Sequence, residues 1–388
     1  MERPGLLAMN ISSIQKQFRQ RLIYTGCLAS MLLSACTASI HTPYNSRASA
    51  LIAQSTSSLQ THSAGALFDY EKQRIDFDNH DAPYKKHTKR KGPVPLFTAS
   101  AGSGYQLKYI QFPALRDNGQ KDKLIRIRYY KYNRKNQDRG KNKTPLIIIV
   151  PIYGSYVYPS EVMTKQLLGL QPRANVALLE YHQNLLDFES LATAQTEADV
   201  LNIFTKRIRD RIVAGVIDVR QVIDWAEQQT EIDPGRIALV TFSMSALVGT
   251  LAAFHEPRLT AGVIVMGAAQ PYDVLSVCQG RPGIARATVQ ERFGWTQEQY
   301  REHMFRIFRP LDPVIYAGMA NPARILMIDA ELDDCMPKQS RDALWESLGR
   351  PERISYRYSH KKAFLPMTPL GFNVMRHKIH DFMEKVLQ

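Results

Sequence analysis

The sequence predicts an α/β domain whose central sheet is mostly parallel and is covered by helices on both faces. The run "LIIIVP" at residues 146–151 is continuous and β-branched, which is typical of a parallel strand covered on both sides. Similar apolar runs alternate with helical segments along the rest of the chain. A chain of 388 residues that is 44% hydrophobic is long enough to bury one large core.

The domain begins with two strands, each with one solvent-exposed face. Residues 105–114 ("YQLKYIQFPA") and 123–132 ("KLIRIRYYKY") alternate apolar and polar side chains, and Asn118-Gly119 between them indicates a hairpin. The elements expected after them are a strand at 146–151, a helix at about 160–168, a strand at 175–181, a long helical region at about 197–229, strands at 236–241, 261–267, 324–330 and 354–358, and a last helix with Phe372, Met375, Ile379, Phe382 and Val386 on one face.

An insertion interrupts this alternation. Over fifty residues separate the strand that ends at Gly267 from the strand that begins at Arg324, which is too many for one crossover helix. The insertion contains "ATVQERFGWTQEQYREHMFRIF", a helical pattern. We expect a helical cap at about residues 270–318, over the carboxyl edge of the sheet. Two ordinary crossover helices joined by a long loop remain the alternative.

The first 35 residues have the pattern of an export signal, in which three basic residues precede the apolar run 22–35. That run ends in "LSAC", which resembles the lipobox of bacterial lipoproteins. The resemblance implies cleavage before Cys36, acylation of Cys36 and attachment to a membrane. Thr37 then favours the outer membrane, with the protein facing the periplasm. Cys27 is a second candidate for the lipidated residue, and Met9 an alternative start.

Composition divides the chain further. We expect a signal peptide at 1–35, a flexible tether rich in Ser, Thr and Ala at 36–65, a basic N-terminal wrap at 66–104, and the α/β domain at 105–388. The net charge of +14 falls to +11 without the signal, because residues 1–35 hold four basic side chains and one acidic one.

The positive charge is concentrated at residues 85–91 and 131–143. In an exported lipoprotein, anionic lipid or lipopolysaccharide is a better partner for it than nucleic acid, and solvated loops are the simplest interpretation. We therefore expect no nucleic-acid partner, and the oligomeric state is left open. Only Cys36, Cys278 and Cys335 remain after the signal. A disulfide between the last two is allowed, but the sequence does not determine it.

A candidate nucleophile lies in "RIALVTFSMSA", where a buried strand runs through a tight turn into a helix. This stretch resembles the GxSxG nucleophile elbow of the α/β-hydrolase superfamily, and its "DPGRIALV" lead-in is similar to dienelactone hydrolases, acetyl esterases and prolyl oligopeptidases. Alignment on the strand makes Ser243 the nucleophile. The other frame, with Ser245, would crowd the helix–strand contact with Leu247. In the favoured frame Thr241 and Ser245 replace the two glycines, and the bulkier Thr241 could alter the elbow.

The resemblance also implies an acid and a base, in the chain order Ser, Asp, His. Asp333 lies four residues before Pro337 in "ILMIDAELDDCMPKQS", which matches the family's D-x-x-x-P pattern; Asp334 and Glu331 are the alternatives. His360 is the histidine between the last strand and the last helix. Of the other histidines considered, His377 and His380 read as surface residues, and His182 could line the pocket.

Backbone amides would hold the developing oxyanion. By position they are those of Met244 and of Ile152 or Tyr153, although Pro151 stands where the family usually has the histidine of a His-Gly pair.

The sequence therefore predicts a membrane-anchored serine hydrolase of the carboxylesterase type, acting on a small ester or related acyl compound. It holds no Walker loop, no GxGxxG after a strand and no zinc motif, so we expect no cofactor and no metal. Phe293, Trp295 and Phe308 suggest an apolar acyl pocket in the cap. The alternatives are a non-catalytic envelope protein with the same fold, and an acyltransferase or peptidase that uses the same three residues.

Overall fold

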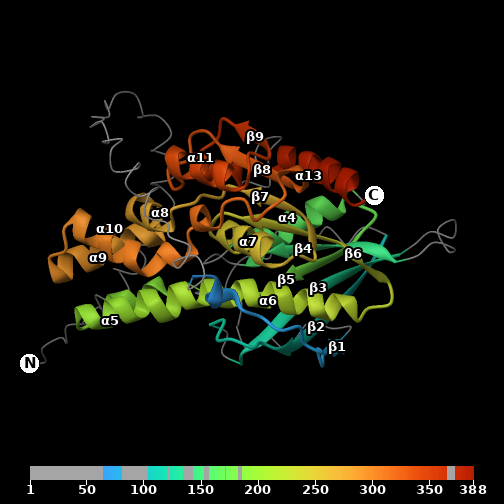
Figure 1. Ribbon diagram of the computed structural model, residues 1–388, viewed down its shortest axis with the longest axis horizontal. Helices are drawn as coiled ribbons and strands as arrows, with labels where there is room; N and C mark the ends of the chain where they lie inside the picture. Colours follow the sequence, from blue (N-terminus) through green and yellow to red (C-terminus); the bar gives the residue numbers. More distant parts are fainter. Residues whose placement is uncertain are drawn as a thin grey trace, which may run out of the picture. The chain divides into compact units, whose positions relative to one another are not determined.

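The computed structural model describes residues 64–80, 104–119, 122–133, 143–152, 157–170, 172–181, 186–364 and 372–388. Its centre is a nine-stranded sheet with the order β1-β2-β3-β5-β4-β6-β7-β8-β9 (Figure 1). The strands are β1 (Asp78–His80), β2 (Tyr105–Pro113), β3 (Leu124–Tyr132), β4 (Thr144–Val150), β5 (Asn175–Leu179), β6 (Ile232–Phe242), β7 (Leu259–Val265), β8 (Ile325–Ala330) and β9 (Glu352–Tyr356).

Most of the sheet is parallel. Strands β5, β4, β6, β7, β8 and β9 pair in parallel, whereas β1, β2 and β3 form an antiparallel edge that joins β5. The helices are α4 (Val157–Leu168), α5 (Glu197–Asn202), α6 (Asp210–Glu227), α7 (Met244–His255), α8 (Pro271–Val277), α9 (Arg281–Phe293), α10 (Gln297–Phe308), α11 (Lys338–Ser347), α12 (His360–Ala363) and α13 (Phe372–Val386). The predicted α/β architecture is confirmed.

The sheet has a separate apolar core on each face. Ile148 of β4 packs into the core that contains residues of α6 and α7. Its neighbours Ile147 and Ile149 pack into the opposite core, with residues of α4 and α13. Successive side chains of a strand point to opposite faces, so a strand covered on both sides must be apolar throughout. This explains the uninterrupted run of isoleucines in β4.

The long helical region is less regular than the sequence pattern indicates. A π-helical stretch, η4 (Ile203–Arg209), separates α5 from α6. A π turn contains more residues than an α turn and therefore shifts the phase of the helix. Three apolar residues of this stretch, Ile203, Phe204 and Ile208, are buried. The 3.6-residue pattern did not reveal the interruption.

Residues 64–80 pack against the α/β domain, partly within the segment that we expected to be a basic wrap. The ring of Phe68 is buried and stacks on His255 at a centroid distance of 4.5 Å. The Tyr70 hydroxyl donates a hydrogen bond of 2.5 Å to the buried carboxylate of Asp224 in α6. Burial, followed by the nearby Arg220 cation, lowers the pKa of His255 to about 4, so this ring is neutral at neutral pH.

The insertion between β7 and β8 contains α8, α9 and α10. Figure 1 shows these helices gathered on the left beside α5. Helix α9 also contacts the 3₁₀ helix η3 (Phe188–Thr193), and Arg292 donates to the carbonyl of Ala194 over 2.6 Å. The cap is therefore assembled from two segments, the insertion and the chain after β5. The sequence pattern indicated only the first of them.

The three aromatic residues of the cap that we singled out pack tightly with other rings. Phe308 is fully buried, and its ring lies edge-on to Phe204. Trp295 is 6% exposed and stacks on His303 at 4.2 Å. Phe293 is tilted against Trp295. These rings pack against one another and against the core, and the acyl pocket stays a prediction.

Candidate active site

The elbow lies between β6 and α7, at the carboxyl edge of the sheet. Ser243 has φ 56° and ψ −127°, a conformation that residues other than glycine rarely adopt. Its N–H donates to the Val265 carbonyl over 2.9 Å, and its carbonyl accepts from the Ala246 N–H over 2.8 Å. These bonds hold the turn on both sides. The strained backbone at the serine is what a nucleophile elbow requires.

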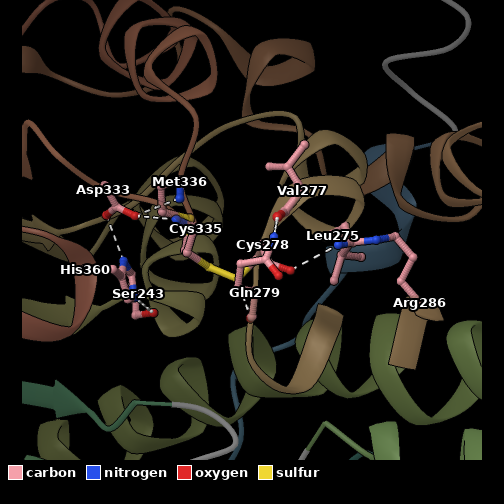
Figure 2. The surroundings of a disulfide bond; sticks show 10 residues. All are labelled: Ser243, Leu275, Val277, Cys278, Gln279, Arg286, Asp333, Cys335, Met336 and His360. Atoms are coloured by element: carbon pink, nitrogen blue, oxygen red, sulfur yellow. Dashed lines mark hydrogen bonds and ion pairs between the residues drawn. A yellow bond between two sulfur atoms is a disulfide. The ribbon is translucent and has the colours of Figure 1, made fainter. Parts of the chain in front are cut away.

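The three residues predicted for catalysis are joined by hydrogen bonds (Figure 2). The distance from Ser243 Oγ to His360 Nε2 is 2.8 Å, and that from His360 Nδ1 to Asp333 Oδ2 is 2.7 Å. The side chain of Asp333 has no exposed area, whereas the alternatives Asp334 and Glu331 are both exposed. The topology thus brings together the ends of β6, β8 and β9.

The remaining oxygen of Asp333 also has partners. Asp333 Oδ1 accepts the N–H groups of Cys335 and Met336, both over 2.8 Å. The carboxylate is therefore fixed by its own loop on one side and by His360 on the other. A buried carboxylate needs such bonds, because burial without them is costly.

The imidazole of His360 is held by aromatic packing. His360 is the first residue of α12, and its ring lies edge-on to Phe364 at a centroid distance of 5.4 Å. Phe364 in turn lies edge-on to Phe242, the residue before Ser243, at 6.4 Å. Among the other histidines, His377 is exposed on α13, His380 lies beside Asp381 on the same helix, and His182 lies outside the described residues.

Arg341 of α11 anchors the two ends of the loop that carries Asp333. Its guanidinium donates to the carbonyls of Ala330 (2.6 Å), Glu331 (3.4 Å) and Met336 (3.1 Å). Its side chain is only 5% exposed and lies 3.7 Å from the carboxylate of Asp329. Sequence reasoning missed this residue, because an arginine in an amphipathic helix gives no sign of facing inward.

Thr241 fits the elbow because Gly249 faces it. A Cβ placed on Gly249 of α7 would lie 2.4 Å from Thr241 Oγ1 and 2.5 Å from Thr241 Cγ2. The absence of a side chain at Gly249 thus leaves the room that the side chain of Thr241 occupies. Thr241 is fully buried, and within the described structure its hydroxyl has no hydrogen-bond partner.

Ser245 has a structural part in the elbow. Its hydroxyl accepts the N–H of Phe242 over 3.0 Å and lies within hydrogen-bond distance of the carbonyls of Phe242 (2.9 Å) and Val150 (3.2 Å). It is buried and ties the turn to the end of β4. We predicted only that a small side chain was tolerated here, so this bonding is a further finding.

The backbone amides predicted to bind the oxyanion differ in their hydrogen bonding. Met244 is the first residue of α7, where backbone N–H groups have no partner within the helix. The N–H of Ile152, by contrast, donates to the hydroxyl of buried Ser160 over 3.0 Å. This amide is engaged with Ser160 in the structure, and the role of Ile152 as an oxyanion donor stays a prediction. Tyr153, the other choice, lies outside the described residues.

A disulfide joins Cys278, just after α8, to Cys335 (Figure 2). Cys335 lies on the loop between β8 and α11 that carries Asp333, here called the acid loop. The sequence had left this pairing open. Cys278 belongs to a small apolar cluster with Val274 and Met336, against which Met244 and Cys335 pack. Within the described ranges, no three His, Cys, Asp or Glu side chains are grouped to hold a metal ion, and no helix is long and apolar enough to cross a membrane.

Comparison with known proteins shows the fold. An acetyl xylan esterase from Paenibacillus sp. R4 superposes with a TM-score of 0.55 at 16% identity, over 85% of this chain and 94% of the esterase. Acetyl xylan esterase 1 from Thermoanaerobacterium sp. JW/SL YS485 gives 0.56 at 14% identity, over 85% and 93%. The chain therefore has the α/β-hydrolase fold. No family model and no curated protein sequence matches it.

Proposed function

We propose that this protein is a serine hydrolase that cleaves a small ester or related acyl compound through an acyl-enzyme on Ser243. The observation that carries the proposal is the unbroken chain of hydrogen bonds from Ser243 through His360 to Asp333. A serine hydroxyl is a weak nucleophile at neutral pH and needs a base within hydrogen-bond reach. The base in turn needs a partner that fixes its tautomer.

The proposed reaction begins when Ser243 Oγ attacks the acyl carbon and its proton passes to His360 Nε2. Asp333 holds the Nδ1 proton and stabilises the imidazolium that forms. The backbone N–H of Met244 then faces the developing oxyanion. Collapse of the intermediate expels the alcohol, which takes the proton from His360. Water, activated by the same imidazole, releases the acid and frees Ser243.

An ester is favoured as the scissile group for two reasons. The first is that an alcohol is a better leaving group than an amine, so ester cleavage demands less of the same catalytic groups. The second is that two proteins described as acetyl xylan esterases share the fold over most of their length. Their identity to this chain is low, so the sugar that they act on is not carried over.

Fluorophosphonate trapping tests the proposal. The full chain should hydrolyse a short p-nitrophenyl ester and lose this activity when a fluorophosphonate reacts with it. Peptide mass spectrometry should then find one phosphonyl group on Ser243, because a nucleophile with a neighbouring base reacts far faster than an ordinary serine. An enzyme that neither hydrolyses the ester nor takes up the label, beside a known esterase that does both, would contradict the proposal.

We further propose that the protein acts at the bacterial envelope, anchored through lipidated Cys36. The sequence pattern before Cys36 and the disulfide between Cys278 and Cys335 support this together, since stable disulfides form in oxidising compartments outside the cytosol. Cells grown with labelled palmitate should incorporate the label into the wild-type chain. The Cys36→Ser variant should take up none, whereas Cys27→Ser should be labelled normally. Persistent labelling of Cys36→Ser would refute the anchor.

A further inference from the structure

We infer that the Cys278–Cys335 disulfide is a positioning element for Asp333, so that catalysis depends on the oxidised state of this bridge. The inference rests on the proposed function, because it assigns a role to Asp333. It starts from a short connection: Cys335 is two residues from Asp333, and its own backbone N–H donates to Asp333 Oδ1 over 2.8 Å. Whatever fixes the backbone of Cys335 therefore also fixes the carboxylate that orients His360.

The other end of the bridge is anchored in the cap. Cys278 is buried, and its N–H donates to the Val274 carbonyl over 2.8 Å. Arg286 of α9 donates to the carbonyls of Cys278 (3.3 Å) and Leu275 (3.1 Å), which ties α8 to α9 at this point (Figure 2). The bridge thus joins the acid loop to a part of the cap that has its own hydrogen bonds and packing.

Most of the other contacts of this loop lie at its two ends or before Cys335. Arg341 holds the carbonyls of residues 330, 331 and 336, at the two ends of the loop. Between them, the N–H of Leu332 donates to the Tyr358 carbonyl over 3.0 Å and the N–H of Asp333 to the Ala330 carbonyl over 3.3 Å. Cys335 itself is held by its bond to the Asp333 carboxylate and by the bridge. Loss of the bridge should therefore leave the ends of the loop in place. The middle of the loop, which carries Asp333, should become more mobile.

Reduction of the bridge is a two-electron step. A thiolate of a dithiol reductant attacks one bridge sulfur, and the other cysteine leaves as a thiolate. The second thiol of the reductant then resolves the mixed disulfide, which yields two cysteine thiols and one oxidised reductant. Cys335 is partly exposed whereas Cys278 is 4% exposed, so attack at the Cys335 sulfur is the accessible route.

The test compares the full chain before and after reduction with dithiothreitol, with a p-nitrophenyl ester as substrate. We expect kcat to fall roughly 10- to 100-fold with little change in KM, because displacements near 1 Å in a catalytic group have effects of that size. The acidic limb of the kcat/KM profile should move to lower pH, since a looser Asp333 stabilises the His360 imidazolium less. Reoxidation should restore both.

The matched control is the double variant Cys278→Ser/Cys335→Ser, which keeps Cys27 and Cys36. It should behave as the reduced wild type does and should not respond to dithiothreitol. Equal kcat and equal pH profiles in oxidised and reduced wild type would overturn the inference. So would a double variant that still responds to the reductant. Loss of the far-ultraviolet circular dichroism of the reduced protein would also overturn it, because the bridge would then hold the fold rather than Asp333.

A second measurement does not depend on activity. The proton on His360 Nδ1, which lies in the 2.7 Å hydrogen bond to Asp333, can be observed by NMR in both redox states, with His360→Gln used to assign its signal. We expect this signal to shift or broaden in the reduced protein, and an unchanged signal would contradict the positioning role. If the oxidised enzyme cleaves no ester, the proposed function fails, and this spectrum still decides the inference. If it cleaves esters equally well in both states, only the inference fails.

Discussion

Replacing Ser243 by alanine is expected to lower kcat for ester hydrolysis by about 10⁶-fold, the magnitude measured when the nucleophile of a serine hydrolase is removed. The reason is that no acyl-enzyme can form, although Met244 and the binding surface remain. KM should change little. The measurement is steady-state kinetics on a short ester, with the variant purified separately from any active enzyme and its fold checked by circular dichroism.

Ser245→Ala is the matched control, because it removes the neighbouring hydroxyl at a site two residues away. It deprives the Phe242 N–H of its acceptor, which costs about 1–3 kcal/mol of stability. Catalysis should remain within roughly tenfold of wild type, since the nucleophile and its base are untouched. If Ser245→Ala abolished activity and Ser243→Ala retained it, the assignment of the nucleophile would be wrong.

Gly249→Ala is expected to lower the free energy of unfolding by about 1–3 kcal/mol, even though alanine is the better helix former. The added methyl group would lie less than 3 Å from three side-chain atoms of Thr241. Thr241 is buried in β6 and cannot swing aside, so α7 or the elbow must shift. A shifted elbow should also lower kcat. Urea unfolding and ester kinetics measure the two effects.

The contact can be tested by a double-mutant cycle. In a Thr241→Gly background the clash is gone, and Gly249→Ala should be neutral or stabilising. Thr241→Val keeps the volume of the side chain, so Gly249→Ala should remain harmful in that background. If the cost of Gly249→Ala were the same in all three backgrounds, the two positions would not be complementary, and the tolerance of Thr241 would need another explanation.

Much of the sheet could be predicted, because a strand that is buried on both faces requires a run of consecutive apolar residues. The isoleucines of β4 had to be apolar at consecutive positions, and this identified the strand. The strand β1 left no such record, because exposed residues such as Asp78 and Asn79 at a sheet edge need no particular pattern. The π-helical stretch at 203–209 was invisible for a related reason, since its buried residues also suit an ordinary helix.

The site was predictable where chain order and strand ends fix a position. Ser243, Asp333 and His360 each follow a different strand, and parallel strands bring these ends to one edge. The hydrogen bond that the Ile152 N–H donates was not predictable, because its acceptor is the side-chain hydroxyl of Ser160 on the following helix. The Cys278–Cys335 pair and the inward-facing Arg341 depend on distances that only the folded chain sets.

Because the chain is synthesised from its N-terminus, the late position of His360 determines when the candidate site can be assembled. The proposed nucleophile, Ser243, lies between β6 and α7, whereas the proposed base, His360, comes only with α12, after β9. A chain that is still being synthesised or exported, or that is truncated before residue 360, carries Ser243 without its base. If the proposed mechanism holds, such a chain should not attack acyl groups, and the protein should become reactive only after residue 360 has been made and folded.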